Sequence, residues 1–339
     1  MRQQIIGWFI CTTFTIIGFS CDSQTEIQEK FLRFQDLYAK SIANSNQKNP
    51  TEKQQEQLHT VLAELKNTDQ TSFEYHLASF SNSHFNQSKI NELKEAIAIK
   101  PTDKHVLFQL AAFQFITKDK SSLKVTLKQI QDLECFSKYE LNYAKILLQN
   151  LKEGEWLITS GFDDTYPILM VQLLENYRPD ITVVPLLFLL SKDFQEELNI
   201  SQLVTKNKGL INSELLHNWS NNWSKTTSIA LTVPPQFYEL INTKLYVTGL
   251  SLRYSVTSIP NGNLNEIFLN ETSMQWFNHV VSNADKKMTA NFIPCLLNLH
   301  FHYKLNNNRT ELLKIKSFIN QIGQHISEPN LYQQLNLME

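Results

Sequence analysis

Apolar positions along the chain follow three patterns that change with residue number. Across residues 22–150 they recur at helical spacing, and glycine is absent from this stretch. Further on, residues 155–160 and 181–190 have the composition of strands, and residues 168–176 between them have the periodicity of a helix. Residues 272–326 return to helical spacing. The pattern predicts a helical region, then an α/β module, then terminal helices.

An internal repeat of 33 positions runs through the helical region. Apolar residues recur at this interval in five pairs: Leu77 and Leu110, Ala78 and Ala111, Phe80 and Phe113, Ile90 and Leu123, and Ile97 and Ile130. Such a period is typical of helix–turn–helix repeats. The region resembles a tetratricopeptide array of two or three units, with a degenerate first unit at about 28–65. A generic helical bundle is the alternative.

The strand–helix–strand pattern of residues 155–190 predicts a βαβ unit, whose two strands should be parallel. Further strands are expected at 228–233 and 244–248. The predicted fold class is therefore α/β with α-helical repeats: a tetratricopeptide-like array, a small parallel-sheet α/β module, and C-terminal helices. Two of those helices should join at residues 306–308, where three asparagines stand in a row.

The first residues have the features of a bacterial lipoprotein signal. Arg2 precedes an apolar stretch at 5–19, which is shorter than the roughly 20 residues that a membrane-spanning helix needs. The stretch ends in Gly-Phe-Ser before Cys21, and polar residues follow. We expect cleavage before Cys21 and lipid on its thiol, which would hold the protein to a membrane. An ordinary signal peptide or an N-terminal anchor is the alternative.

The composition of the chain limits which partners and which kinds of site are expected. The chain has 339 residues and a formal net charge of −2, and it has no basic stripe, so nucleic acid is not an expected partner. Of its four cysteines, Cys11 leaves with the signal and Cys21 is the predicted lipid site. Cys135 and Cys295 remain, and free thiols are favoured over a disulfide. No CxxC motif is present, and neither a metal nor a cofactor is predicted.

Five segments are expected along the chain. They are a signal peptide at 1–20, the helical domain at 21–151, the α/β module at 152–260, C-terminal helices packed on that module at 261–327, and a tail at 328–339.

The turn at residues 161–167 is the sharpest local feature. Asp163, Asp164 and Thr165 stand between the end of a strand and the start of a helix. In an open parallel sheet, ligands bind at this edge. Two adjacent carboxylates could hold a divalent cation or hydrogen-bond sugar hydroxyls. Asp or Thr could equally cap the helix N-terminus, and capping is favoured.

Two blocks carry a resemblance to a known family. Residues 161–167 read Gly-Phe-Asp-Asp-Thr-Tyr-Pro, and residues 177–184 read Tyr-Arg-Pro-Asp-Ile-Thr-Val-Val. They resemble a region of bacterial multispanning membrane proteins, common in Bacteroidota, that are labelled protein O-mannosyltransferase-like. The likeness covers roughly residues 150–325 and lies in the soluble C-terminal extension of that family, a domain of unknown function. It implies a shared α/β module.

This chain departs from the family block, which usually reads Gly-Asp-Asn-Asp-Thr-Phe/Tyr-Pro. Phe162 stands at the first acidic position, and Asp163 stands at the position of Asn. The multispanning half, to which the transferase chemistry belongs, has no counterpart in this sequence. No catalytic residue is therefore carried over from the family.

Two further pairs of residues are weaker candidates for a binding site. Trp219 and Trp223 are four residues apart and could form an aromatic surface for a glycan or a protein, or pack inside their own domain. His300 and His302 are two apart, and on a helix such positions point in different directions, so a shared metal is not expected.

The sequence favours a lipid-anchored lipoprotein of the cell envelope, expected at the outer membrane, that serves as a non-catalytic protein-interaction or scaffold subunit. Its expected partners are the membrane, through the lipid, and a protein of an envelope complex. The alternative is a glycan- or ligand-binding α/β domain centred on Asp163 and Asp164, for which enzymatic activity is left open.

Overall fold

Helices packed in pairs form the first part of the chain. The structure is a computed structural model, and it describes residues 25–43, 46–272, 282–328 and 331. A helix at 25–42 is followed by α2 (Glu52–Asp69), α3 (Phe73–Ser81), the 3₁₀ turn η1 (Gln87–Lys89), α4 (Ile90–Ile99), α5 (Lys104–Ile116), α6 (Lys120–Asp132) and α7 (Lys138–Gln149). Side chains that accept hydrogen bonds from free N–H groups begin most of these helices: Thr51, Ser72, Asp103, Asp119 and Ser137.

Residues that recur at the 33-residue interval lie in two of these helix pairs. α3 packs on α4, and α5 packs on α6. Ala78 and Ala111 are fully buried, and the rings of Phe80 and Phe113 meet edge to face at 6.1 Å. The predicted helical region is confirmed, whereas its assignment to tetratricopeptide repeats is not confirmed and stays a prediction.

A five-stranded sheet follows the helices. Its strands are β1 (Trp156–Thr159), β2 (Thr182–Pro185), β3 (Thr227–Ala230), β4 (Leu245–Thr248) and β5 (Ser251–Tyr254), in the spatial order β2-β1-β3-β5-β4. β1 is parallel to both β2 and β3, and α8 (Phe162–Leu174) connects β1 to β2. The predicted βαβ unit is therefore confirmed.

The prediction of a parallel sheet is wrong for half of the sheet. β5 is antiparallel to both β3 and β4. β4 and β5 are joined by only Gly249 and Leu250, and so short a link can connect only antiparallel strands. Gly249 has a φ of +56°, and a Cβ there would lie 2.5 Å from Nδ2 of Asn150, so the turn requires glycine.

Shorter helices complete the fold. The predicted strand at 181–190 ends at Pro185, and the rest of that apolar run forms the 3₁₀ helix η2 (Leu186–Leu190). The remaining elements are α9 (Lys192–Glu197), α10 (Ser201–Lys206), α11 (Ser213–Ser220), η3 (Pro235–Phe237), η4 (Glu239–Lys244), α12 (Asn261–Glu271), α13 (Asn283–Ala290), α14 (Ile293–Leu305) and α15 (Arg309–His325). The expected break at 306–308 is confirmed between α14 and α15.

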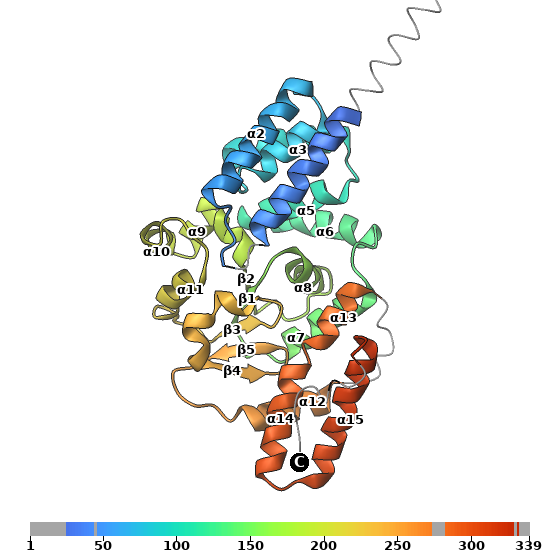
Figure 1. Cartoon of the computed structure of the whole chain (residues 1–339), viewed down its shortest axis with the longest axis vertical. Coiled ribbons are helices and arrows are strands. Elements are labelled where there is room, and N and C mark those ends of the chain that lie inside the picture. The colour runs from blue at the N-terminus through green and yellow to red at the C-terminus, as the bar shows by residue number, and fades with distance from the viewer. Residues whose placement is uncertain (1–24, 44–45, 273–281, 329–330, 332–339) are drawn as a thin grey trace, which may run out of the picture.

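Helices and sheet share one continuous apolar core. α8 packs against both the sheet and the helices α6 and α7. Phe188 of η2 meets the rings of Phe85 and Phe115 at 5.4 and 5.6 Å. Figure 1 shows the early helices at one end of the molecule, the sheet in the middle, and α14 and α15 at the other end.

Arg178 also fixes the helical region to the sheet. Its guanidinium donates hydrogen bonds to the carbonyl oxygens of Leu148 and Leu151 at the end of α7. Asp180 in turn accepts two hydrogen bonds from that guanidinium.

In the described parts of the chain, no helix has the combined length and hydropathy that crossing a membrane requires.

Candidate functional site

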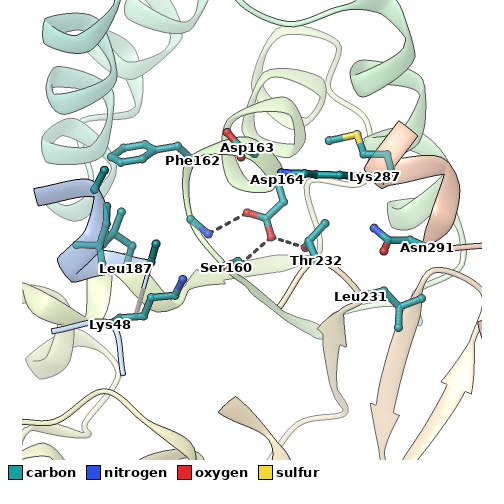
Figure 2. Close-up of a pocket in the computed structure, with 15 residues that line it drawn as sticks. Lys48, Ser160, Phe162, Asp163, Asp164, Leu187, Leu231, Thr232, Lys287 and Asn291 are labelled. Carbon is teal, nitrogen blue, oxygen red and sulfur yellow. Dashed lines mark hydrogen bonds between the residues drawn. The ribbon is translucent and has the colours of Figure 1, made fainter. Parts of the chain in front are cut away.

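A cavity of about 590 Å³ lies at the carboxyl ends of β1 and β3 (Figure 2). We call it the sheet-edge cavity. Its wall is built from the β1–α8 turn, the loop after β3, the connector after helix 25–42, and α13. Its charged and polar lining residues are Lys48, Ser160, Asp163, Asp164, Thr232, Lys287 and Asn291. The cavity therefore occupies the edge of the sheet at which the sequence predicted a site.

Asp164 is a structural cap within this site. Its carboxylate accepts hydrogen bonds from the backbone N–H groups of Ser160 (2.7 Å) and Gly161 (3.0 Å), and from the Thr232 hydroxyl (2.6 Å). The residue is 4% exposed. Burial raises the pKa of this carboxyl group, and the three hydrogen bonds oppose the rise. Asp164 thus fixes the loop that carries it.

The other two candidate residues of the turn have different surroundings. Asp163 is exposed, and Figure 2 shows its carboxylate pointing away from the hydrogen bonds of Asp164. Thr165 is fully buried, and its hydroxyl lies 2.8 Å from the hydroxyl of Thr159 at the end of β1. The structure brings the three residues to one turn but gives only Asp163 free access to the cavity.

Lys48 is a functional candidate that the sequence did not single out. It lies in the connector after helix 25–42 and is only 8% exposed. Burial lowers the pKa of its ammonium group, and the charges of Asp164 and Asp163 act in the opposite direction. Its ammonium nitrogen lies 5.2 Å from the centre of the Phe237 ring.

A second cavity of about 390 Å³ runs along helix 25–42, and we call it the aromatic groove. It lies between that helix and the helices α3 and α5. Its apolar wall consists of Phe31, Phe34, Tyr38, Ala39, Ile42, Leu77, Phe108 and Phe162. Its volume, like that of the sheet-edge cavity, falls within the range of ligand sites in proteins.

Two residues in the wall of the aromatic groove carry a polar atom that is buried from solvent and lacks a hydrogen-bond partner within the described residues. These atoms are the hydroxyl oxygen of Tyr38 and Oε1 of Gln109. The two residues are 8% and 7% exposed. Burial raises the pKa of Tyr38, so its hydroxyl stays a donor. An unsatisfied buried polar group costs stability, so each one needs a physical explanation.

The two cavities share part of their wall. Ala39, Ile42 and Phe162 line both of them. Phe162 stacks on Tyr166 with ring planes 3° apart and centres 5.4 Å apart. Phe162 therefore lies where the sheet-edge cavity and the aromatic groove adjoin.

Of the two alternatives for Trp219 and Trp223, the structure favours packing within their own domain. Trp219 is 3% exposed and lies between Trp156 and Trp223, with ring centres 5.9 Å from each. Trp223 meets Tyr254 of β5 at 4.9 Å. The pair fills the space beside the sheet because burying large rings there stabilises the domain.

The remaining sequence candidates supply no second site. Cys135 and Cys295 are free thiols. Across the described ranges, no cluster of three His, Cys, Asp or Glu side chains could hold a metal ion. Cys21 and the predicted signal at 1–20 lie outside the described residues, as does nearly all of the predicted tail at 332–339.

Comparison with protein-family models, curated proteins and solved structures finds no match for this chain. The resemblance to the O-mannosyltransferase-like family consequently stays a prediction. Function has to be argued from the two cavities.

The sequence missed Lys48, Tyr38 and Gln109 as site residues. Lys48 stands in a polar connector, where a lysine is ordinary. Tyr38 and Gln109 occupy ordinary helical positions, and only the packing of helix 25–42 against α5 brings both into the wall of one groove.

Proposed function

We propose that the chain is a lipid-anchored, non-catalytic binding subunit of the cell envelope, whose aromatic groove holds an apolar peptide segment of a partner protein. The observation that carries this proposal is the aromatic groove of about 390 Å³, whose largely apolar wall also includes Tyr38 and Gln109, the two residues with a buried, unpartnered polar atom. A protein keeps such atoms at a cost in stability, which a bound ligand can offset.

The chemistry of those two atoms favours a peptide. The Tyr38 hydroxyl is a donor, and Oε1 of Gln109 is an acceptor. A peptide group offers one carbonyl acceptor and one N–H donor, so it satisfies both. A hydrocarbon chain offers neither. The aromatic side chains around them suit apolar residues of the bound segment.

The state of Asp164 supports binding rather than catalysis. Three donors already occupy its carboxylate, and they include two backbone groups at the start of α8. A general base needs a free lone pair aimed at its substrate. Asp164 instead holds the turn in place.

The predicted lipid on Cys21 and the tetratricopeptide-like array complete the proposal. Helical arrays of that kind bind partners on their concave face. Replacing Cys21 with serine should abolish incorporation of labelled palmitate and move the protein from the membrane fraction to the soluble fraction. An unchanged membrane fraction would contradict lipid anchoring.

Peptide binding is tested with a pool of synthetic hexapeptides randomised among Leu, Ile, Val, Phe and Ala. Ala39 is exposed yet lines both cavities, so Ala39→Trp should fill the groove without disturbing the core. The matched control is Leu32→Trp, on the same helix but outside both cavities. We expect the wild type and Leu32→Trp to retain peptides and Ala39→Trp to lose about tenfold in retention. Equal retention by all three proteins would overturn the proposal.

A second function is favoured by one specific observation. The exposed Asp163 stands beside a cavity of about 590 Å³, and a free carboxylate there can accept hydrogen bonds from sugar hydroxyls. The alternative is thus a glycan-binding module at the sheet edge. Screening a glycan array with the wild type and Asp163→Ala distinguishes the two. Glycan binding that depends on Asp163, without peptide retention, would favour the alternative.

A further inference from the structure

Lys48 is the buried positive charge of the sheet-edge cavity. More than nine-tenths of the residue is buried, and it lines the cavity wall. Among the described residues its ammonium group forms no salt bridge, and its close contact is with the face of Phe237. A buried ammonium group without an anion is costly, so its presence needs an explanation.

The backbone around Lys48 is held firmly in place. The Lys48 N–H group donates to the carbonyl of Ile211 at 2.9 Å. The Ile211 N–H group donates back to Oδ1 of Asn49 at 2.6 Å, and Nδ2 of Asn49 bonds to the carbonyl of Gly209. These bonds join the connector to the segment between α10 and α11. The ammonium group is therefore positioned before any ligand arrives, which lowers the entropic cost of binding.

The charges around Lys48 restrict what it can bind. Burial lowers the pKa of its ammonium group, and the charges of Asp164 and Asp163 in the same cavity oppose that effect. The exposed Lys287 lies in the cavity wall on α13. Two positive and two negative groups leave the local charge near zero. A dianion such as phosphate would meet the repulsion of both carboxylates, whereas a single carboxylate adds only one charge.

The aromatic groove leads toward this charge. From Phe31 to Ile42 the helix rises about 16 Å at roughly 1.5 Å per residue, and residues along this length line the groove. A segment of about five residues in extended conformation spans the same length at roughly 3.3 Å per residue. Ala39, Ile42 and Phe162 line both cavities, so the groove and the sheet-edge cavity are adjacent at these residues.

We propose that Lys48 binds the C-terminal carboxylate of a peptide whose apolar residues lie in the aromatic groove. The inference rests on the proposed function above and deepens it. It makes the chain a reader of free protein ends with apolar residues, because an internal peptide segment has no carboxylate for Lys48.

The first experiment compares the hexapeptide pool as free acids with the same pool as C-terminal amides. For the wild type we expect the acids to bind about tenfold more tightly. The preference should vanish in Lys48→Met, which removes the charge and keeps much of the side-chain volume. It should survive in Lys225→Met, the matched control at an exposed lysine outside both cavities. Equal binding of acids and amides by the wild type would overturn the inference.

The second experiment tests Lys48 without the peptide. Saturation-transfer NMR measures the binding of 3-phenylpropionate, of 3-phenylpropanamide, and of inorganic phosphate as a competitor. We expect the acid to bind the wild type and Lys225→Met but not Lys48→Met, and the amide to bind none of them. Displacement by phosphate at an equal concentration would show a phosphate site and overturn the assignment to carboxylate.

The two experiments separate this inference from the proposed function. Retention of acids and amides alike, unaffected by Lys48→Met, would leave the peptide groove intact and refute the carboxylate site. Binding of 3-phenylpropionate through Lys48 without peptide retention would support the carboxylate site and refute the peptide groove. Failure of every probe would refute both.

Discussion

The hydroxyl of Thr232 donates a 2.6 Å hydrogen bond to the carboxylate of Asp164, across 68 positions of sequence. The bond joins the loop after β3 to the first turn of α8, and these two segments form adjacent walls of the sheet-edge cavity. The shape of the cavity thus depends on one buried carboxylate that bridges two loops.

We predict that Asp164→Ala lowers the free energy of unfolding by about 2–4 kcal/mol, because it removes a helix cap and leaves two backbone donors and a hydroxyl without their acceptor. The matched variant Asp163→Ala changes an exposed side chain and should cost less than about 0.5 kcal/mol. Urea denaturation of both variants measures the difference. Equal costs would show that Asp164 is not the cap.

The Arg178–Asp180 pair should give the protein a measurable acid dependence. Hydrogen bonding to Arg178 lowers the pKa of the Asp180 carboxyl group to about 2. A depressed folded-state pKa contributes stability above the unfolded pKa of about 3.8, and this contribution is lost as the pH falls toward 2. The stability advantage of the wild type over Asp180→Asn should therefore be constant near pH 6 and shrink between pH 4 and pH 2.

Denaturant unfolding of both proteins across this pH range checks the prediction. The exposed Asp36, paired with Lys40 on helix 25–42, provides a control in Asp36→Asn. If the difference in unfolding free energy between the wild type and Asp180→Asn stays constant down to pH 2, the assigned role of Arg178 is contradicted.

The ion pair between Arg253 and Glu155 lies inside the sheet, with the two side chains 6% and 0% exposed. We predict that Arg253→Met destabilises the protein by about 3–5 kcal/mol, because it leaves the Glu155 charge buried without its cation. Lys314→Met breaks an exposed pair with Glu311 and should cost at most about 1 kcal/mol. Thermal unfolding of the two variants compares them directly, and similar costs would mean that the buried pair is not charged.

Features set by local pattern were predictable from the sequence. The βαβ unit follows from a change of hydrophobic period within residues 155–190, and the break at 306–308 follows from three consecutive asparagines. Capping by Asp164 follows from an acidic residue at the start of a helix.

Features set by distant contacts were not predictable. The antiparallel pairing of β5 depends on the turn at Gly249, which fits against Asn150 from α7. Burial of Trp219 depends on Trp156 and on the face of the sheet that α11 covers. Lys48 becomes a site residue only because Ile211, 163 positions away, fixes the connector beside the sheet. Periodicity carries no information on such pairings.

Tyr38→Phe tests the central claim most directly, because it removes only the hydroxyl oxygen of one residue in the wall of the aromatic groove. That hydroxyl is buried and has no partner among the described residues, so its loss should leave stability unchanged or raise it by up to about 1 kcal/mol in the absence of ligand. The same change should weaken binding of the best-retained hexapeptide about fivefold, the value of one hydrogen bond of about 1 kcal/mol. Calorimetric titration and thermal unfolding of the same two proteins give both quantities. Unchanged affinity together with a lower unfolding temperature would contradict the account, because the hydroxyl would then serve the fold and not a ligand.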